Sequence, residues 1–175
     1  MKAKSSILRV AITGPESTGK STLAQDLANY YQTLWVPEFA RSYLNQLDRP
    51  YREEDLVEIA KGQIRSEEIN AKKANKLLIC DTELTVLKIW SEYKYGQCHP
   101  WIIKELLKHS YDLYLLTSPD IPWEDDPLRE HPEEREKLFD VYLKELKGRK
   151  LPISIISGTP DIRKSTAIRV IDHLL

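Results

Sequence analysis

Short apolar runs alternate with longer segments of helical periodicity along the whole chain. Five runs are rich in Ile, Leu or Val and end at a polar or turn residue, which predicts buried strands. They cover residues 7–13, 34–37, 77–81, 113–117 and 153–157. Because helical segments separate them, the pattern predicts an α/β fold with a five-stranded parallel sheet and helices on both faces. The carboxyl ends of such strands border the ligand crevice.

Apolar residues at spacings of three and four predict the helices. One helix follows the first strand, one precedes the third, one precedes the fifth and one closes the chain. Their marker residues are Leu23, Leu27 and Tyr31; Leu56, Ile59, Ala60 and Ile64; Leu138, Phe139, Tyr142, Leu143 and Leu146; and Ile162, Val170, Ile171 and Leu174. No repeat, low-complexity tract or linker interrupts the pattern, so we expect one domain over residues 1–175.

Composition and charge limit the partners. The 175 residues include 26 Lys and Arg against 27 Asp and Glu, a formal net charge of −1, which excludes the basic surface of a nucleic-acid-binding domain. No apolar run approaches the ~20 residues of a membrane span. Cys80 and Cys98 form no CxxC pattern, which favours a reducing, cytoplasmic location without structural zinc. We expect a small-molecule partner, no nucleic acid and no membrane, and leave the oligomeric state open.

A complete GxxxxGK[ST] phosphate loop follows the first predicted strand. Its glycines let the backbone curl so that N–H groups point at phosphate oxygens, and the helix that starts at Lys20 adds its positive end. Lys20 is expected to reach the β- and γ-phosphates of ATP, and the Ser21 hydroxyl to ligate Mg²⁺. The predicted nucleotide-binding residues are Gly14, Glu16, Ser17, Thr18, Gly19, Lys20, Ser21 and Thr22.

The third predicted strand ends in a carboxylate, Asp81, which is the expected form of a second Mg²⁺-organising group. It can hold the ion directly or through water. The alternative is a turn or helix cap, because Asp81, Thr82 and Glu83 can equally start the next helix. The phosphate loop upstream favours the metal interpretation.

The sequence lacks the motifs that mark other classes of P-loop protein. A GTPase needs a glycine two residues after its switch aspartate and an Asn-Lys-x-Asp motif, and residues 81–84 and 75–78 do not supply them. Large ATPases need sensor and arginine-finger regions, for which 175 residues leave little room. The length fits a small-molecule kinase.

Glu38 and Arg41 follow the second predicted strand and lie on one side of a helix start. Glu38 can accept the proton of an attacking hydroxyl, and Arg41 can stabilise the transferring phosphoryl group. The alternative is an acidic residue that favours the helix dipole, next to a solvated arginine.

Residues 118–132 are rich in proline and acidic residues, which predicts a surface loop or a mobile lid. As a lid, the segment would bring Arg129, with Arg135 close behind, over the phosphates and exclude water. The alternative is a charged loop that is simply solvated.

Residues 90–101 are dense in Trp and Tyr. These rings can line a pocket for a flat ligand, and a cationic ring would gain cation–π attraction. The alternative is a helix end that packs on the core, with His99 as a structural hydrogen-bonding residue.

The chain resembles the ribosylnicotinamide kinase domain of NadR-type proteins, a P-loop family that phosphorylates nicotinamide riboside to nicotinamide mononucleotide. The resemblance spans nearly the whole chain and rests on residues 14–21, 38–41, 81–82, 95–101 and 123–129. It implies a three-layer P-loop NTPase fold, with ATP and Mg²⁺ held at Lys20, Ser21 and Asp81. The riboside would lie between the loops after the second and third strands, with Arg129 closing from the lid.

The resemblance also implies the acceptor site. Either Glu38 or Asp81 would assist the 5′-hydroxyl, and the choice between them stays open because both end strands beside the phosphate loop. The expected substrate contacts are Glu38, Tyr95, His99, Trp101, Trp123 and Asp126.

Two departures from the family pattern are visible. Pro127 stands where relatives commonly carry a glycine, which stiffens the lid, and neither the length nor the charge fits an added helix-turn-helix and adenylyltransferase domain. We therefore expect a stand-alone kinase domain. The alternatives are a kinase of another nucleoside or nucleotide, and a nucleotide-binding ATPase or regulatory module without small-molecule kinase activity.

Overall fold

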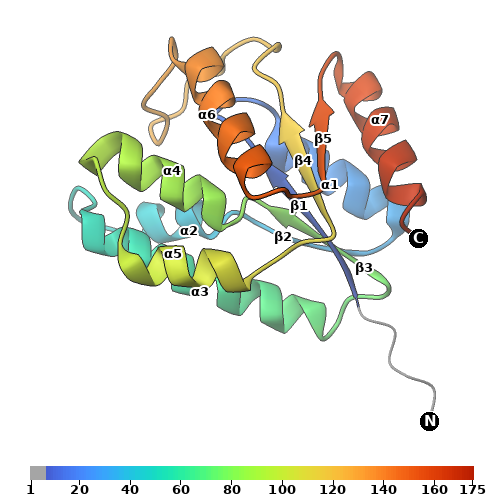
Figure 1. Cartoon of the computed structure of the whole chain (residues 1–175), viewed down its shortest axis with the longest axis horizontal. Coiled ribbons are helices and arrows are strands. Elements are labelled where there is room, and N and C mark those ends of the chain that lie inside the picture. The colour runs from blue at the N-terminus through green and yellow to red at the C-terminus, as the bar shows by residue number, and fades with distance from the viewer. Residues whose placement is uncertain (1–6) are drawn as a thin grey trace.

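The computed structural model describes residues 7–175, which form a sheet surrounded by helices (Figure 1). The elements in chain order are β1 (Leu8–Thr13), α1 (Lys20–Tyr31), β2 (Leu34–Val36), α2 (Phe39–Asn45), α3 (Glu53–Ala71), β3 (Leu77–Asp81), α4 (Leu84–Tyr95), α5 (Pro100–Lys108), β4 (Leu113–Thr117), α6 (Arg135–Gly148), β5 (Ile153–Ile156) and α7 (Pro160–Asp172).

All five predicted strands are confirmed, and they pair in parallel in the order β2-β3-β1-β4-β5. The central position of β1 puts its carboxyl end between those of β3 and β4. Ile12 pairs with Asp81 on one side, and Thr13 pairs with Leu116 on the other. The phosphate loop after β1 is therefore flanked by the loops that follow both neighbouring strands.

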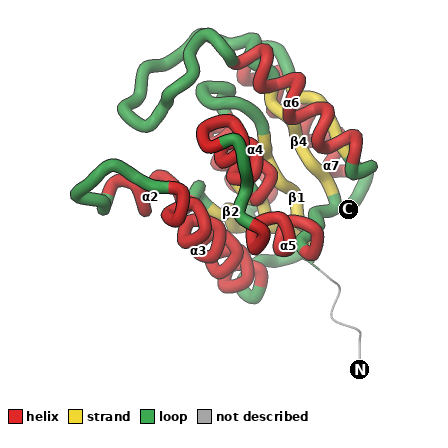
Figure 2. The backbone as a smooth tube through the Cα atoms, turned by 60° about the vertical axis from the view of Figure 1, so that its left-hand side comes forward, coloured by secondary structure: helices red, strands yellow, loops and turns green. Residues whose placement is uncertain are grey.

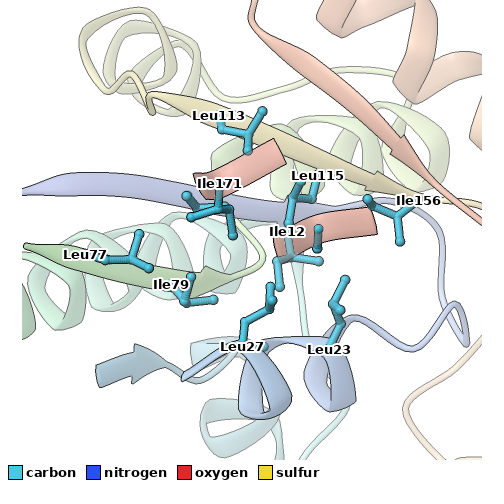
Figure 3. Close-up of a cluster of buried hydrophobic side chains, with 12 residues drawn as sticks. Ile12, Leu23, Leu27, Leu77, Ile79, Leu113, Leu115, Ile156 and Ile171 are labelled. Carbon is cyan, nitrogen blue, oxygen red and sulfur yellow. The ribbon is translucent and has the colours of Figure 1, made fainter. Parts of the chain in front are cut away.

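Alternation along the strands divides the core between the two faces of the sheet. Val10 and Ile12 point to the face covered by α1 and α7, whereas Ala11 points to the opposite face. Figure 3 shows the first of these clusters, in which strand residues meet Leu23 and Leu27 of α1 and Ile171 of α7. Helices therefore cover both faces, as predicted.

The opposite face is covered mainly by α4 and α6, through Ile89, Leu138, Tyr142 and Leu146. A further apolar cluster joins α2, α3, α4 and α5 beyond the sheet. The loop between β4 and α6 and the loop after α2 extend from the same side of the molecule (Figure 2). In the described part of the chain, no helix is long and apolar enough to cross a membrane.

Helices α4 and α5 account for the aromatic segment, where the sequence pattern did not assign helices. Glu83 caps α4, because its carboxylate accepts a hydrogen bond of 2.7 Å from Thr85 N, and Gly96 ends α4 in the left-handed conformation (φ 73°). His99 caps α5, with Pro100 in its first turn. Residues 90–101 therefore form the end of one helix, a turn and the start of the next.

Candidate active site

Glycines shape the phosphate loop between β1 and α1. Gly14 has a φ of 139°, and a Cβ atom there would lie 2.7 Å from Thr117 Oγ1, so no side chain fits. Gly19, at φ 75°, precedes α1 and leaves the N–H groups of the first helical turn without a side-chain cap. A curled loop that ends on an uncapped helix N-terminus offers backbone donors to phosphate oxygens.

Buried hydrogen bonds hold this loop in shape. The Thr18 hydroxyl donates to Pro15 O and lies 2.7 Å from Thr117 Oγ1. Arg163, buried at the start of α7, donates to Thr18 O at 2.7 Å and to Ser118 O at 2.8 Å. The Thr18 hydroxyl therefore has its hydrogen-bond partners within the protein. No local motif marks Arg163 in the sequence, because its partners are distant carbonyl groups.

Lys20 extends back along the loop, and its Nζ donates to Pro15 O at 2.6 Å. Burial lowers the pKa of Lys20, while the negative charges of Glu38 and Asp81 act to raise it. The ammonium group thus lies close to two carboxylates at the floor of the site. A phosphate bound in the loop would give it a stronger partner than a carbonyl oxygen.

Ser21 and Asp81 form the candidate metal site. Ser21 Oγ donates a hydrogen bond of 2.5 Å to Asp81 Oδ2, and Asp81 is 1% exposed. Asp81 Oδ1 is buried and has no hydrogen-bond partner among the described residues, and burial raises the pKa of this carboxyl group. An unpartnered carboxylate oxygen beside a hydroxyl fits a hard cation such as Mg²⁺.

Few protein ligands surround that site. Within residues 7–175, no group of three or more His, Cys, Asp or Glu could hold a metal ion. Mg²⁺ commonly binds through one or two carboxylates and takes its remaining ligands from water and substrate phosphates. The residues present therefore fit an ion that arrives with a nucleotide.

Glu38 lies on the side of the site that is formed by the end of β2 and the start of α2. It is the N-cap residue of α2, but its side chain makes no capping hydrogen bond. Burial raises the pKa of Glu38, Lys20 opposes this, and the charge of Asp81 adds to it. A buried carboxylate with a raised pKa suits a general base.

Arg41 lies one helical turn further along α2. Its guanidinium group forms an ion pair of 2.8 Å with Asp126 of the segment between β4 and α6. Two predicted site residues that are distant in sequence thus contact each other, and Arg41 remains 45% exposed.

We use the name lid for residues 118–134, the segment between β4 and α6. Ser17 of the phosphate loop is its main attachment point. Ser17 Oγ accepts from Glu124 N at 2.9 Å and from the Arg129 guanidinium group at 3.3 Å, and Ser17 O accepts from Arg135 at 2.9 Å. Arg129 also donates to Glu124 O. Arg129 of the lid and Arg135, the first residue of α6, therefore both contact the phosphate loop.

The distal part of the lid has two further attachments. The Glu16 carboxylate accepts from Glu130 N at 3.0 Å and from His131 N at 3.1 Å. Glu130 in turn forms an ion pair of 2.9 Å with Lys94 of α4. The Glu16 and Ser17 side chains, predicted to contact the nucleotide, thus contact the lid in this structure, and their backbone groups remain in the loop.

A cleft of about 370 Å³ connects these parts. The phosphate loop, including Lys20 and Thr22, lines one part together with Glu38, Arg41 and Arg129. An apolar wall lines another. It includes Ala40 and Leu44 from α2, Leu128 from the lid, and Val86, Ile89, Trp90 and Tyr93 from α4.

The α4 residues of this wall follow a helical period. Positions 86, 89, 90 and 93 recur at intervals of three, one and three residues, so they share one face of α4. This spacing was present in the sequence and could have separated Trp90 and Tyr93 from the other aromatic residues.

Three residues expected to contact the substrate, Tyr95, His99 and Trp101, are not among the described residues that line the cleft. His99 Nδ1 accepts from Trp101 N at 3.1 Å and so caps α5. Tyr95 and Trp101 pack against the cluster of α2 to α5. Core packing, the alternative to a ligand contact, is thus observed for these two rings.

Trp123 and Asp126 shape the lid and are likewise outside the described lining of the cleft. Trp123 Nε1 donates to Asp125 at 2.8 Å, and the Arg135 guanidinium carbon lies 5.6 Å from the centre of the indole ring. Asp126 accepts from Leu128 N at 2.9 Å besides pairing with α2. Both residues therefore support the lid's conformation and attachment.

A sequence model of a protein family described as an AAA domain matches residues 9–163. The trifunctional NAD biosynthesis/regulator protein NadR of Salmonella typhimurium is 32% identical over 124 residues, which are 69% of this chain and 30% of that protein. The NadR protein of Escherichia coli K12 is 32% identical over 126 residues, with the same coverage. The chain thus spans less than a third of the length of these relatives.

Solved structures share the fold. The crystal structure of a NadR protein in complex with NR has a TM-score of 0.83 at 24% identity, covering 96% of this chain and 51% of that one. The structure of a deoxyadenosine kinase from M. mycoides has a TM-score of 0.64 at 13% identity, covering 95% of this chain and 100% of that one. The expected P-loop kinase fold is confirmed.

Proposed function

Since the chain belongs to the AAA domain family whose sequence model it matches over residues 9–163, we propose that it is an ATP-dependent, Mg²⁺-requiring kinase of a nucleoside, most specifically nicotinamide riboside. The observation that carries this proposal is the shared cleft. Phosphate-binding groups, a carboxylate with a raised pKa and an aromatic wall all line one cavity or lie directly beside it. A kinase needs these parts together, because donor phosphate and acceptor hydroxyl must meet in one water-poor space.

The donor end would work through positioning and charge. Backbone N–H groups of the phosphate loop and Lys20 would hold the ATP phosphates, and Arg129 would add positive charge from the lid. Ser21 and Asp81 would hold Mg²⁺, and a bound Mg²⁺ ion neutralises phosphate charge. The pairing of Asp81 with the Ser21 hydroxyl supports this role and leaves Glu38 as the better candidate for the base.

Glu38 would act on the acceptor. Its carboxylate accepts the proton of the 5′-hydroxyl while the hydroxyl oxygen forms a bond to the γ-phosphorus. The bond between that phosphorus and the oxygen bridging to the β-phosphate breaks, and ADP leaves. Arg41 would stabilise the charge on the transferring group. Phosphoryl transfer needs accurate placement more than a strong base, so a buried carboxylate suffices.

The aromatic wall would receive the base of the acceptor. Trp90 and Tyr93 lie one turn apart on α4, and the ring centre of His131 lies 5.0 Å from that of Tyr93 in an edge-on arrangement. A positively charged pyridinium ring gains attraction from electron-rich aromatic faces that a neutral base does not. This chemistry, together with the relationship to NadR, favours nicotinamide riboside over other nucleosides.

A coupled assay tests the proposal. Purified protein with Mg-ATP is offered nicotinamide riboside, adenosine, deoxyadenosine, cytidine and thymidine monophosphate, and ADP release and product mass are followed. We expect ADP release that depends on the riboside and a product heavier by one phosphate group. Turnover on another acceptor alone would support a different nucleoside or nucleotide kinase. Tight ATP binding without turnover on any acceptor would refute the kinase and favour a regulatory module.

A further inference from the structure

The first turn of α2 is capped by a residue of another helix. Glu38 holds the N-cap position, yet its carboxylate accepts no hydrogen bond from α2. The Phe39 N–H, the first of the helix, donates to Gln63 Oε1 of α3 at 3.0 Å. An acidic side chain at an N-cap commonly folds back onto the N–H groups of its own helix. Such bonds go to the second and third N–H groups of a helix, so the bond from Phe39 to Gln63 satisfies a different donor. The Glu38 carboxylate makes no bond to α2 and lines the cleft.

Glu67 and Tyr111 set the orientation of the Gln63 amide. Gln63 Nε2 donates to Glu67 Oε1 at 3.2 Å, and the Tyr111 hydroxyl donates to the two Glu67 oxygens at 2.9 and 2.8 Å. Because Glu67 offers only acceptors when ionised, the amide must turn its NH₂ group toward Glu67 and its oxygen toward Phe39. Gln63 and Glu67 are 3% and 2% exposed, so water does not readily replace these bonds.

The same turn of α3 also holds the Phe39 side chain. A Cβ atom at Gly62 would lie 2.1 Å from Phe39 Cε1, so the ring lies directly on the α3 backbone. Gly62 and Gln63 thus hold both the ring and the N–H of the residue that follows Glu38. Backbone rotation at the start of α2 is restricted on two sides.

We propose that Gln63 is a positioning residue for Glu38, oriented by a hydrogen-bonded chain that runs from Tyr111 through Glu67 to the first turn of α2. This inference rests on the proposed function, because it assigns Gln63 a role in presenting the base to the acceptor hydroxyl. A buried polar chain that is fully satisfied fixes one arrangement of the groups at its end. Here the end of the chain is the peptide N–H adjoining the candidate base.

The test compares Gln63→Met with the exchanged pair Gln63→Glu plus Glu67→Gln. The methionine keeps the length of the side chain but removes the acceptor. The exchanged pair restores an acceptor for Phe39 N–H, a donor between positions 63 and 67, and an acceptor for Tyr111. We expect Gln63→Met to lower kcat between about 10- and 100-fold, to change the ATP dissociation constant less than about twofold, and to speed Phe39 amide exchange at least about fivefold. The exchanged pair should recover most of both losses.

A matched control separates positioning from stability. Leu106→Ala removes a buried α5 side chain from the apolar cluster that joins α2, α3, α4 and α5. At a temperature where it remains folded, it should lose stability without the kcat defect. If Gln63→Met does not fold, Gln63→Asn, whose shorter side chain withdraws the oxygen from Phe39, takes its place.

Two results would overturn the inference. One is a Gln63 variant with wild-type kcat and wild-type Phe39 exchange, and the other is an exchanged pair as defective as Gln63→Met. If the wild-type protein phosphorylates no acceptor, the proposed function fails. Amide exchange of Phe39 and the ¹³C titration of the Glu38 carboxyl group then still decide whether Gln63 governs this turn.

Discussion

Ser21 Oγ donates a hydrogen bond of 2.5 Å to Asp81 Oδ2, across 60 residues of sequence. Asp81→Asn keeps an acceptor for Ser21 but removes the charge that would hold Mg²⁺. We expect turnover to fall at least about 100-fold, with loss of the Mg²⁺ dependence of ATP affinity. Burial raises the pKa of Asp81, so the folded protein disfavours its charged form. The Asp81→Asn variant should therefore unfold at the same temperature as the wild type or at a higher one. Calorimetry and ATP titrations with and without Mg²⁺ check both effects, and unchanged Mg²⁺ dependence would remove Asp81 from the metal site.

Lys20 and Arg129 should differ in their contributions to ATP affinity and to kcat. Lys20→Ala removes a contact made to the phosphates in every bound state, so we expect ATP binding and turnover to be lost together. Arg129→Ala should lower kcat about 10- to 100-fold with a small change in ATP affinity, since a lid cation acts chiefly in the closed, reacting state. Isothermal titration and steady-state kinetics separate the two, with Lys104→Ala on α5 as an exposed control. Equal losses of binding would contradict the lid assignment.

The ion pair between Arg41 and Asp126 links α2 to the lid at 2.8 Å. Because Arg41 is nearly half exposed, the pair should contribute no more than about 1 kcal/mol to the free energy of unfolding. Arg41→Ala should lower kcat more than Asp126→Asn, because only Arg41 is proposed to act on the phosphoryl group. A double-mutant cycle on kcat and stability at low and high salt measures this. A larger kcat loss for Asp126→Asn would reverse the assignment.

Two rings of α4 should differ in their effect on the acceptor. Trp90→Leu removes a ring that lines the cleft, so the KM for nicotinamide riboside should rise about 3- to 30-fold. The KM for a neutral riboside should rise less. Tyr95→Leu, on the same helix but outside the cleft lining, is the matched control and should leave both values unchanged. An equal or larger effect at Tyr95 would show that the acceptor binds elsewhere.

Glu67 should make stability depend on pH. Burial raises its pKa from the ordinary 4.5 to about 7, against the opposing hydrogen bonds of Tyr111 and Gln63. The charges of Glu83 and Arg9 also act on it, in opposite directions. The folded state then binds the proton more tightly, so the stability that Glu67 contributes is fully present below about pH 4.5 and is lost as the pH rises to about 7.

Glu67→Gln removes this titration. Relative to the wild type, its free energy of unfolding should rise between about pH 4.5 and 7, by a total on the order of 3 kcal/mol. Urea unfolding at several pH values measures the difference. Glu68→Gln, an exposed neighbour on α3, serves as the control. A pH-independent difference between wild type and Glu67→Gln would contradict the raised pKa.

Local sequence was enough for the strands, the phosphate loop and the carboxylate that ends β3. Residues 77–81 form an uninterrupted apolar run closed by Asp81, and the loop from Gly14 to Ser21 depends on backbone conformations that glycine allows. These properties arise within a few residues of one another, so neighbouring positions encode them. The parallel direction of the strands follows from the helices between them, whereas their order in the sheet does not.

Tertiary structure alone decided which side chains share the site. Trp90 and Tyr95 both pack against the cluster of α2 to α5, but of these two rings Trp90 also lines the cleft, a difference that depends on where α4 packs. Arg163 supports the phosphate loop from 145 residues away, and Gln63 caps a helix 24 residues distant. Such contacts are set by the arrangement of whole elements in space, and no local pattern of residues encodes them.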